Sequence, residues 1–193
     1  MTSSGSTDGT VDEALPTAVL EIEGHAAEAG WDQPARLFAL VETARLVERE
    51  PHLAGRVGDA VLTPIEQEAV AEASQLEDQL ATITWPETVH GCAALVERVV
   101  LPPGAEADVP DEPVGAASFA SKHPDMQEVR IVVAATRTGA SYCALRLRGH
   151  DTAESVLTGP DLVPGLVDLV RGTLDGSTPD ARGDGAQGGA RHE

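Results

Sequence analysis

The chain has 193 residues and a formal net charge of -19, from 13 basic and 32 acidic side chains. A field of that sign repels phosphate backbones and anionic lipid, so we expect neither nucleic acid nor a membrane surface as partner. Two cysteines are too few for a disulfide scaffold, and no apolar run approaches the roughly 18 residues of a membrane span. Residues 1–12 lack the basic and apolar regions of a signal peptide. We therefore expect a cytoplasmic protein with reduced thiols.

The length predicts a single domain, large enough to bury about 70% of the surface of the unfolded chain. Residues 1–12 and 176–193 consist mainly of small, polar and charged residues, which cannot offset the entropy lost on ordering. Both segments are predicted to be disordered tails, and the folded domain is then residues 13–175. We expect trimming to that core to leave the melting temperature nearly unchanged.

Three helices are predicted in the first half of the chain, because apolar residues recur there at spacings of three and four. They cover about residues 15–30, 33–50 and 63–80, with a glycine-bearing loop over 51–62. Proline stands in the first turn of each helix, where its missing N–H costs nothing. The third helix begins with Thr63–Glu66, whose threonine and glutamate have the spacing of a capping box.

The periodicity changes to 2 in the second half of the chain. Residues 92–101 carry apolar side chains on both alternating faces, which predicts a central strand covered on both sides. Residues 104–125 predict a loop. Residues 126–136 and 140–148 predict a β-hairpin, with Gly139 as the left-handed residue of a three-residue turn.

The last regular element is a helix predicted to begin near Asp161 and to end before Gly176. Since three helices precede the first strand, no strands remain for a parallel β-α-β arrangement. We therefore predict an α+β fold, with N-terminal helices packed on a three- to four-stranded antiparallel sheet and closed by a C-terminal helix.

Three arginines of the predicted hairpin, Arg130, Arg146 and Arg148, share one face of adjacent strands. Like charges opposite one another repel, so the arginines require partners. Glu97 from the central strand is the simplest partner, which would make the group a structural salt-bridge cluster. In that case we expect Arg146→Ala to cost about 0–1 kcal/mol, as for an exposed ion pair.

The alternative is that these arginines form a small anion-binding groove. Guanidinium groups bind carboxylates and phosphates through paired hydrogen bonds, so the ligand would be a partner's carboxylates or a phosphorylated molecule. His150 and Asp151 follow the second hairpin strand and would lie at the rim of the groove. The candidate ligand-binding residues are therefore Arg130, Arg146, Arg148, His150 and Asp151.

Cys92, Cys143 and His150 are the only other residues that suggest a metal site or a catalytic site. The spacing of His90 and Cys92 is too tight for a usual zinc site, and both cysteines lie within apolar alternation, where a thiol acts as a small hydrophobic side chain. Cys92 could be a nucleophile with His90 or His150 as base, but reactive thiols favour exposed, electropositive surroundings. We expect no catalytic residue, no metal and no cofactor.

Three segments carry a resemblance to known proteins: Trp85–Pro103, Glu128–Val132 and Ala144–Asp151. Over roughly residues 14–174 the sequence resembles a family of small acidic proteins from high-GC actinobacteria without an assigned activity. This resemblance implies a cytoplasmic location and no catalytic residues. In architecture the chain is similar to the type III secretion chaperone-like class, in which helices flank a short antiparallel sheet and dimers are common.

We predict a non-catalytic binding or chaperone-like adaptor, whose partner is another protein or a second copy of the chain. The alternative is an enzyme or metal-binding protein that uses Cys92, Cys143 and His150. Elemental analysis of the dialysed protein distinguishes the two, since a metal protein would retain stoichiometric zinc or iron.

Overall fold

The computed structural model describes residues 5–67, 75–101, 119 and 123–175. Within these ranges six strands form one sheet: β1 (Arg36–Glu42), β2 (Leu62–Glu66), β3 (Gly91–Val100), β4 (Gln127–Thr136), β5 (Ser141–Leu147) and β6 (Leu157–Gly159). The α-helices within the same ranges are α1 (Gly5–Ala29), α2 (Thr43–Arg49), α3 (Leu76–Thr82) and α5 (Pro164–Gly172). The 3-10 turns are η1 (Pro51–Leu53), η4 (Arg148–His150) and η5 (Ala153–Ser155).

Every neighbouring pair of strands is antiparallel, in the spatial order β2-β1-β3-β4-β5-β6. The predicted α+β class and antiparallel sheet are confirmed, and the predicted C-terminal helix is α5. The prediction of three to four strands is wrong, because the sheet has six. The additional strands are β1 and β2, both in segments predicted to be helical, and the short β6 at the other edge.

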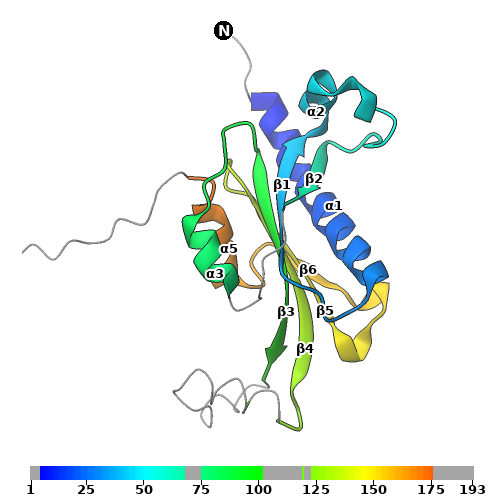
Figure 1. Ribbon diagram of the computed structural model, residues 1–193, viewed down its shortest axis with the longest axis vertical. Helices are drawn as coiled ribbons and strands as arrows, with labels where there is room; N and C mark the ends of the chain where they lie inside the picture. Colours follow the sequence, from blue (N-terminus) through cyan, green and yellow to red (C-terminus); the bar gives the residue numbers. More distant parts are fainter. Residues whose placement is uncertain (1–4, 68–74, 102–118, 120–122, 176–193) are drawn as a thin grey trace, which may run out of the picture.

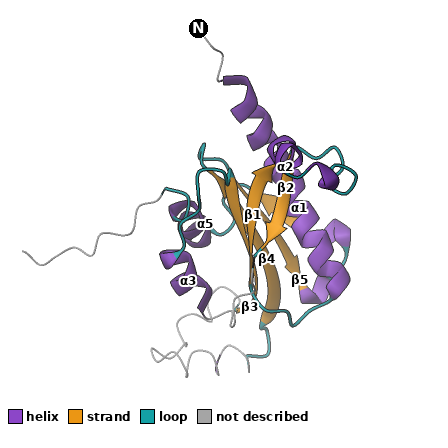
Figure 2. Ribbon diagram, turned by 45° about the horizontal axis from the view of Figure 1, so that its top comes forward, coloured by secondary structure: helices purple, strands orange, loops and turns teal. Residues whose placement is uncertain are grey.

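The sheet lies between two layers of helix, with α1 on one face and α3 and α5 on the other (Figures 1 and 2). β3 shows why both layers form. Cys92, Ala94 and Val96 enter the core with α3 and α5, whereas Ala93 and Leu95 enter the core with α1. All five are fully buried, at 0% exposure. The predicted central strand, covered on both sides, is therefore confirmed.

Residues 33–50, predicted as the second helix, form β1 followed by the seven-residue α2. The four consecutive apolar residues 37–40 are all buried. A strand directs successive side chains to opposite faces, so an uninterrupted apolar run suits a strand with a core on each face. A single helix lying on a sheet would leave part of that run in solvent.

Residues 63–80, predicted as the third helix, form β2 and then α3, while residues 68–74 lie outside the described residues. Thr63 therefore does not begin a capping box. Its Oγ1 lies 2.8 Å from Oγ1 of Thr43, at the junction of β1 and α2. In the described part of this segment, pairing with β1 outweighs the local preference for a helix start.

β2 is an outer strand of the sheet, and Pro64 lies at its centre. Before the strand the N–H of Thr43 donates to Val61 O at 3.0 Å, and after it the N–H of Gln67 donates to Leu37 O at 2.8 Å. Odd-numbered residues of β2 therefore turn their backbone groups toward β1. Pro64 turns its nitrogen, which carries no hydrogen, to the outside.

The predicted hairpin is confirmed as β4 and β5, with Arg130 opposite Arg146. Gly139 has a φ of 97°, in the left-handed region that glycine adopts without steric cost. The predicted C-terminal helix begins slightly later than Asp161. Most of the loop predicted over 104–125 lies outside the described residues.

α1 begins at Gly5 rather than near residue 15. Val11 is only 1% exposed, and Asp12 Oδ1 accepts a hydrogen bond of 2.8 Å from Thr136 Oγ1 in β4. The boundary predicted at residue 13 is therefore wrong, since Val11 and Asp12 belong to the folded domain. Among the helices that the structure describes, α1 included, none combines the length and apolar character needed to cross a membrane.

Candidate functional site

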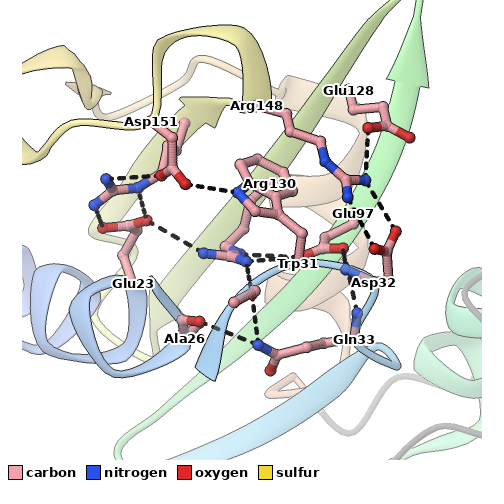
Figure 3. Close-up of polar contacts among 12 residues, drawn as sticks. Glu23, Ala26, Trp31, Asp32, Gln33, Glu97, Glu128, Arg130, Arg148 and Asp151 are labelled. Atoms are coloured by element: carbon pink, nitrogen blue, oxygen red, sulfur yellow. Dashed lines mark hydrogen bonds and ion pairs between the residues drawn. The ribbon is translucent and has the colours of Figure 1, made fainter. Parts of the chain in front are cut away.

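The three predicted arginines meet on the α1 side of the sheet, where Arg146 bonds Glu23 of α1 and lies opposite Arg130. Figure 3 shows Arg130 and Arg148 among their carboxylate partners. Arg130 in β4 and Arg146 in β5 are directly opposite, and Arg148 is the first residue of η4. Together with their partners they form what we call the Trp31 cluster. Its members are Glu23, Trp31, Asp32, Glu97, Glu128, Arg130, Arg146, Arg148 and Asp151.

Arg130 is the buried centre of the Trp31 cluster, with 0% of its surface exposed. Its Nε and Nη2 donate to Glu97 Oε1 at 3.1 and 2.8 Å, and Nη2 also donates to the carbonyl of Gly30. Its guanidinium carbon lies 4.5 Å from the centre of the Trp31 ring, within cation–π distance. The prediction that Glu97 pairs with the arginine face is therefore confirmed.

Arg146 makes a paired bond with a carboxylate that the sequence does not suggest. Its Nε and Nη2 donate to the two oxygens of Glu23 in α1, at 2.5 and 2.6 Å. Both residues are buried, at 5% and 2% exposure. The hydrogen bonds that Arg146 donates to Glu23 raise the pKa of Arg146 above its usual value, against the effect of burial. Nη1 also donates to Asp151 Oδ1 at 3.3 Å.

This burial corrects the energy expected for Arg146→Ala. A cost of about 0–1 kcal/mol applies to an exposed ion pair, in which water solvates whichever charge remains. Removing Arg146 would leave the carboxylate of Glu23 buried without its main partner. The cost is then expected near the 3–5 kcal/mol typical of a broken buried pair.

Arg148 forms the exposed side of the Trp31 cluster. Its Nη1 and Nη2 donate to the two oxygens of Asp32, both at 2.9 Å, and Nη1 also donates to Glu128 Oε2 at 2.7 Å. Its guanidinium carbon lies 5.6 Å from the centre of the Trp31 ring. The hydrogen bond from Arg148 lowers the pKa of Asp32, while Asp32 and Glu128 raise the pKa of Arg148.

The turn that carries Trp31 and Asp32 follows directly after α1. Asp32 has a φ of 64°, which is uncommon for a residue other than glycine. Its N–H donates to Glu97 Oε2 at 2.7 Å, and the N–H of Gln33 donates to the same oxygen at 3.3 Å. The indole N–H of Trp31 donates to Asp151 Oδ2 at 2.9 Å and lowers the pKa of that carboxyl. Glu97 and Asp151 thus hold the turn in place.

Two hollows adjoin Arg148. The first, of about 180 Å³, is lined by Trp31, Asp32, Glu97, Arg98, Val99, Glu128 and Arg148. The second, of about 290 Å³, lies toward η4 and includes His150 and Met126 in its wall. The structure thus places His150 and Asp151 beside the arginines, as predicted, although His150 lies in the second hollow and Asp151 is bonded within the cluster.

The charges of the Trp31 cluster are strongly paired. Each of its three guanidinium groups bonds at least one of its five carboxylates. A phosphate or carboxylate ligand would therefore have to displace a carboxylate that is already bound. The cluster has more acidic than basic groups, which favours a cationic ligand over the anionic one considered from sequence.

The sequence alone does not identify Glu23 and Trp31 as members of the Trp31 cluster. Glu23 lies on the inner face of α1 one residue after Ile22, and a single acid there reads as part of a solvated face. Trp31 had a visible signal, because it follows Gly30 at the end of a predicted helix in a chain with only two tryptophans.

The three residues of the alternative enzyme or metal site, Cys92, Cys143 and His150, do not lie together in the structure. Cys92 in β3 and Cys143 in β5 are both buried, with β4 between them, whereas His150 lies exposed in η4. Burial raises the pKa of the Cys92 thiol to about 12 and also raises that of Cys143. Within the described ranges, no group of three or more His, Cys, Asp and Glu side chains is placed to hold a metal.

We expect Cys92 in the folded protein to react with iodoacetamide at pH 7.5 at least a thousand times more slowly than free cysteine. Burial raises its pKa from about 9 to about 12, and each unit lowers the thiolate fraction tenfold. A mass-spectrometric time course measures this, with protein in urea as the control in which both thiols react. Rapid modification of Cys92 in the folded protein would contradict its description as a buried thiol with a raised pKa, and would favour the hypothesis that Cys92 is a nucleophile.

Comparison with known proteins gives one result that bears on identity. Residues 15–175 match the family model described as PPA1309-like protein. No curated protein and no solved structure matches the chain. The architectural similarity to type III secretion chaperones therefore has no structural neighbour to support it.

Proposed function

Because the chain belongs to the PPA1309-like protein family over residues 15–175, a range that includes the whole Trp31 cluster, we propose that this cluster is the site of a common function, the non-catalytic binding of another protein. The protein is then an adaptor of the cytoplasm, with a chaperone-like role toward its partner. The observation that carries the proposal is a half-buried tryptophan held in a fixed turn beside a surface hollow.

Tryptophan is among the residues that contribute most often to binding energy at protein interfaces, near hollows that a partner can fill. Trp31 lies at the edge of such a hollow. Val99 adds an apolar surface to it and is 39% exposed. Since the surrounding bonds already fix the indole, a partner would lose little entropy in ordering this surface.

Capture from native lysate with matched variants tests the proposal. The bait proteins are the wild type, Trp31→Ala, Val99→Ser and the control Leu20→Ala, which changes an exposed side chain on α1 outside the hollow. We expect one partner to bind the wild type and the control equally. The recovery of this partner should fall at least tenfold with Trp31→Ala and severalfold with Val99→Ser. Val99→Ser is the milder change and keeps the test valid if the Trp31→Ala protein does not fold.

A protein retained equally by all four baits, or by none, would contradict the proposal. Light scattering of the wild type and Val99→Ser during size-exclusion chromatography shows whether the partner is a second copy of the chain. The alternative of an enzyme or metal protein using Cys92, Cys143 and His150 predicts bound zinc or iron after dialysis, which elemental analysis measures.

A further inference from the structure

We propose that Trp31, Asp32 and Glu128 form a receptor for a guanidinium group, that Arg148 occupies this receptor within the same chain, and that the partner inserts an arginine of its own in place of Arg148. This inference rests on the proposed function and names the chemistry of the partner as a segment with an accessible arginine. We call these three residues the guanidinium receptor.

The guanidinium receptor supplies what a planar cation with several donors requires. Asp32 accepts two parallel hydrogen bonds of 2.9 Å, the arrangement that distinguishes a guanidinium from the single ammonium of lysine. Glu128 accepts a further bond of 2.7 Å, and the Trp31 ring lies 5.6 Å from the guanidinium carbon. An aromatic ring with two carboxylates therefore defines both the charge and the shape of the bound group.

The guanidinium receptor is held in place by contacts that do not involve Arg148. The backbone of Asp32 is bonded to Glu97, and the Trp31 indole is bonded to Asp151 and contacts the guanidinium of Arg130. Glu128 is in β4, paired with β3 on one side. The Trp31 ring and the backbones of Asp32 and Glu128 would thus keep their positions if the side chain of Arg148 moved away, and the two carboxylates would then face a vacant place.

The bound arginine is exchangeable because it lies at the surface. The side chains of Arg148 and Asp32 are 39% and 73% exposed, whereas those of Arg130 and Arg146 are only 0% and 6% exposed. Exposed ion pairs contribute little net free energy, so replacing one guanidinium by another costs little. The two hollows that Arg148 lines provide room for an approaching segment. The net charge of -19 also attracts a basic partner.

The test uses N-acetyl-arginine amide as the probe and N-acetyl-lysine amide as its comparison. Each is titrated into the full-length wild type, Arg148→Ala and Arg148→Gln, with the indole N–H resonance of Trp31 observed by NMR. We expect both Arg148 variants to bind the arginine probe at least fivefold more tightly than the wild type, because the internal competitor is gone. They should bind the lysine probe at least fivefold more weakly than the arginine probe.

Two control proteins complete the test. Arg45→Ala removes an exposed arginine paired with Glu42, outside the guanidinium receptor, and should bind like the wild type. Adding Asp32→Asn to Arg148→Ala should abolish the preference for arginine. An Arg148→Ala protein that gives no response, or responds equally to both probes, would overturn the inference.

The outcome is separable from that of the proposed function. If the lysate partner depends on Trp31 and Val99 but Arg148→Ala shows no arginine binding, the surface binds a protein by other chemistry and only this inference fails. If arginine binding is found but no partner depends on these side chains, the receptor exists and the proposed function fails.

Discussion

Replacing Glu23 by glutamine should lower the free energy of unfolding by about 3–5 kcal/mol, the range for breaking a buried ion pair. Glu23 is 2% exposed and accepts two hydrogen bonds from Arg146, so its loss leaves a buried guanidinium without its main counter-charge. Arg130 is affected as well, because its Nη1 lies 4.0 Å from Glu23 Oε1. Equilibrium unfolding in urea measures the change.

Glu21→Gln is the matched control, since Glu21 is exposed on the same helix and should change the free energy by less than about 0.5 kcal/mol. The double replacement of Glu23 and Arg146 by leucine should recover most of the lost stability, because it removes both buried charges together. If Glu23→Gln costs no more than Glu21→Gln, water reaches the pair and the description of it as buried is wrong.

Gly91→Ala should destabilise the protein by about 1–3 kcal/mol or more, the cost of forcing an additional methyl group into a packed site. A Cβ at Gly91 would lie 2.6 Å from the carbonyl oxygen of Ala135, which is backbone of the neighbouring strand β4. It would also lie 3.3 Å from Leu40 Cδ1. A side chain can rotate away, but here β3 and β4 themselves must separate.

Gly24→Ala is the control for this substitution. Gly24 is in α1, and a Cβ there would meet nothing within 4 Å. Alanine favours a helix by about 0.8–1.0 kcal/mol over glycine, so this variant should be slightly stabilised. Thermal and urea unfolding of the two variants compare them directly. A Gly91→Ala protein as stable as the wild type would show that the strands adjust at no cost.

The second half of the fold was predictable because apolar residues there alternate regularly along each strand. β3, β4 and β5 alternate with a period of 2, and Gly139 marks the turn between the last two. The register of a hairpin follows from such a turn, so the approach of Arg130 to Arg146 could be inferred from spacing alone. Glu97 could be proposed as a partner from its charge, but the spacing does not fix its register against Arg130.

The first half was not predictable in the same way. Residues 33–50 and 63–80 contain apolar spacings of three and four, yet the described part of each begins with a strand, β1 or β2. Pairing of β1 with β2 and with β3 outweighs the local preference for helix there. The partners Glu23 and Trp31 depend on how α1 crosses the sheet. Glu23 lies 123 residues from Arg146 in sequence, and no local pattern encodes a contact over that separation.

The proline at the centre of β2 has a consequence for how molecules of this protein meet. An exposed sheet edge can accept a strand from another molecule, and repetition of that step leads to fibrils. A strand that approached this edge would find no backbone N–H donor at the centre of β2, because the outward-facing nitrogen of Pro64 carries no hydrogen. Growth of a continuous intermolecular sheet from β2 is therefore disfavoured, and concentrated solutions should be protected from aggregation along this edge.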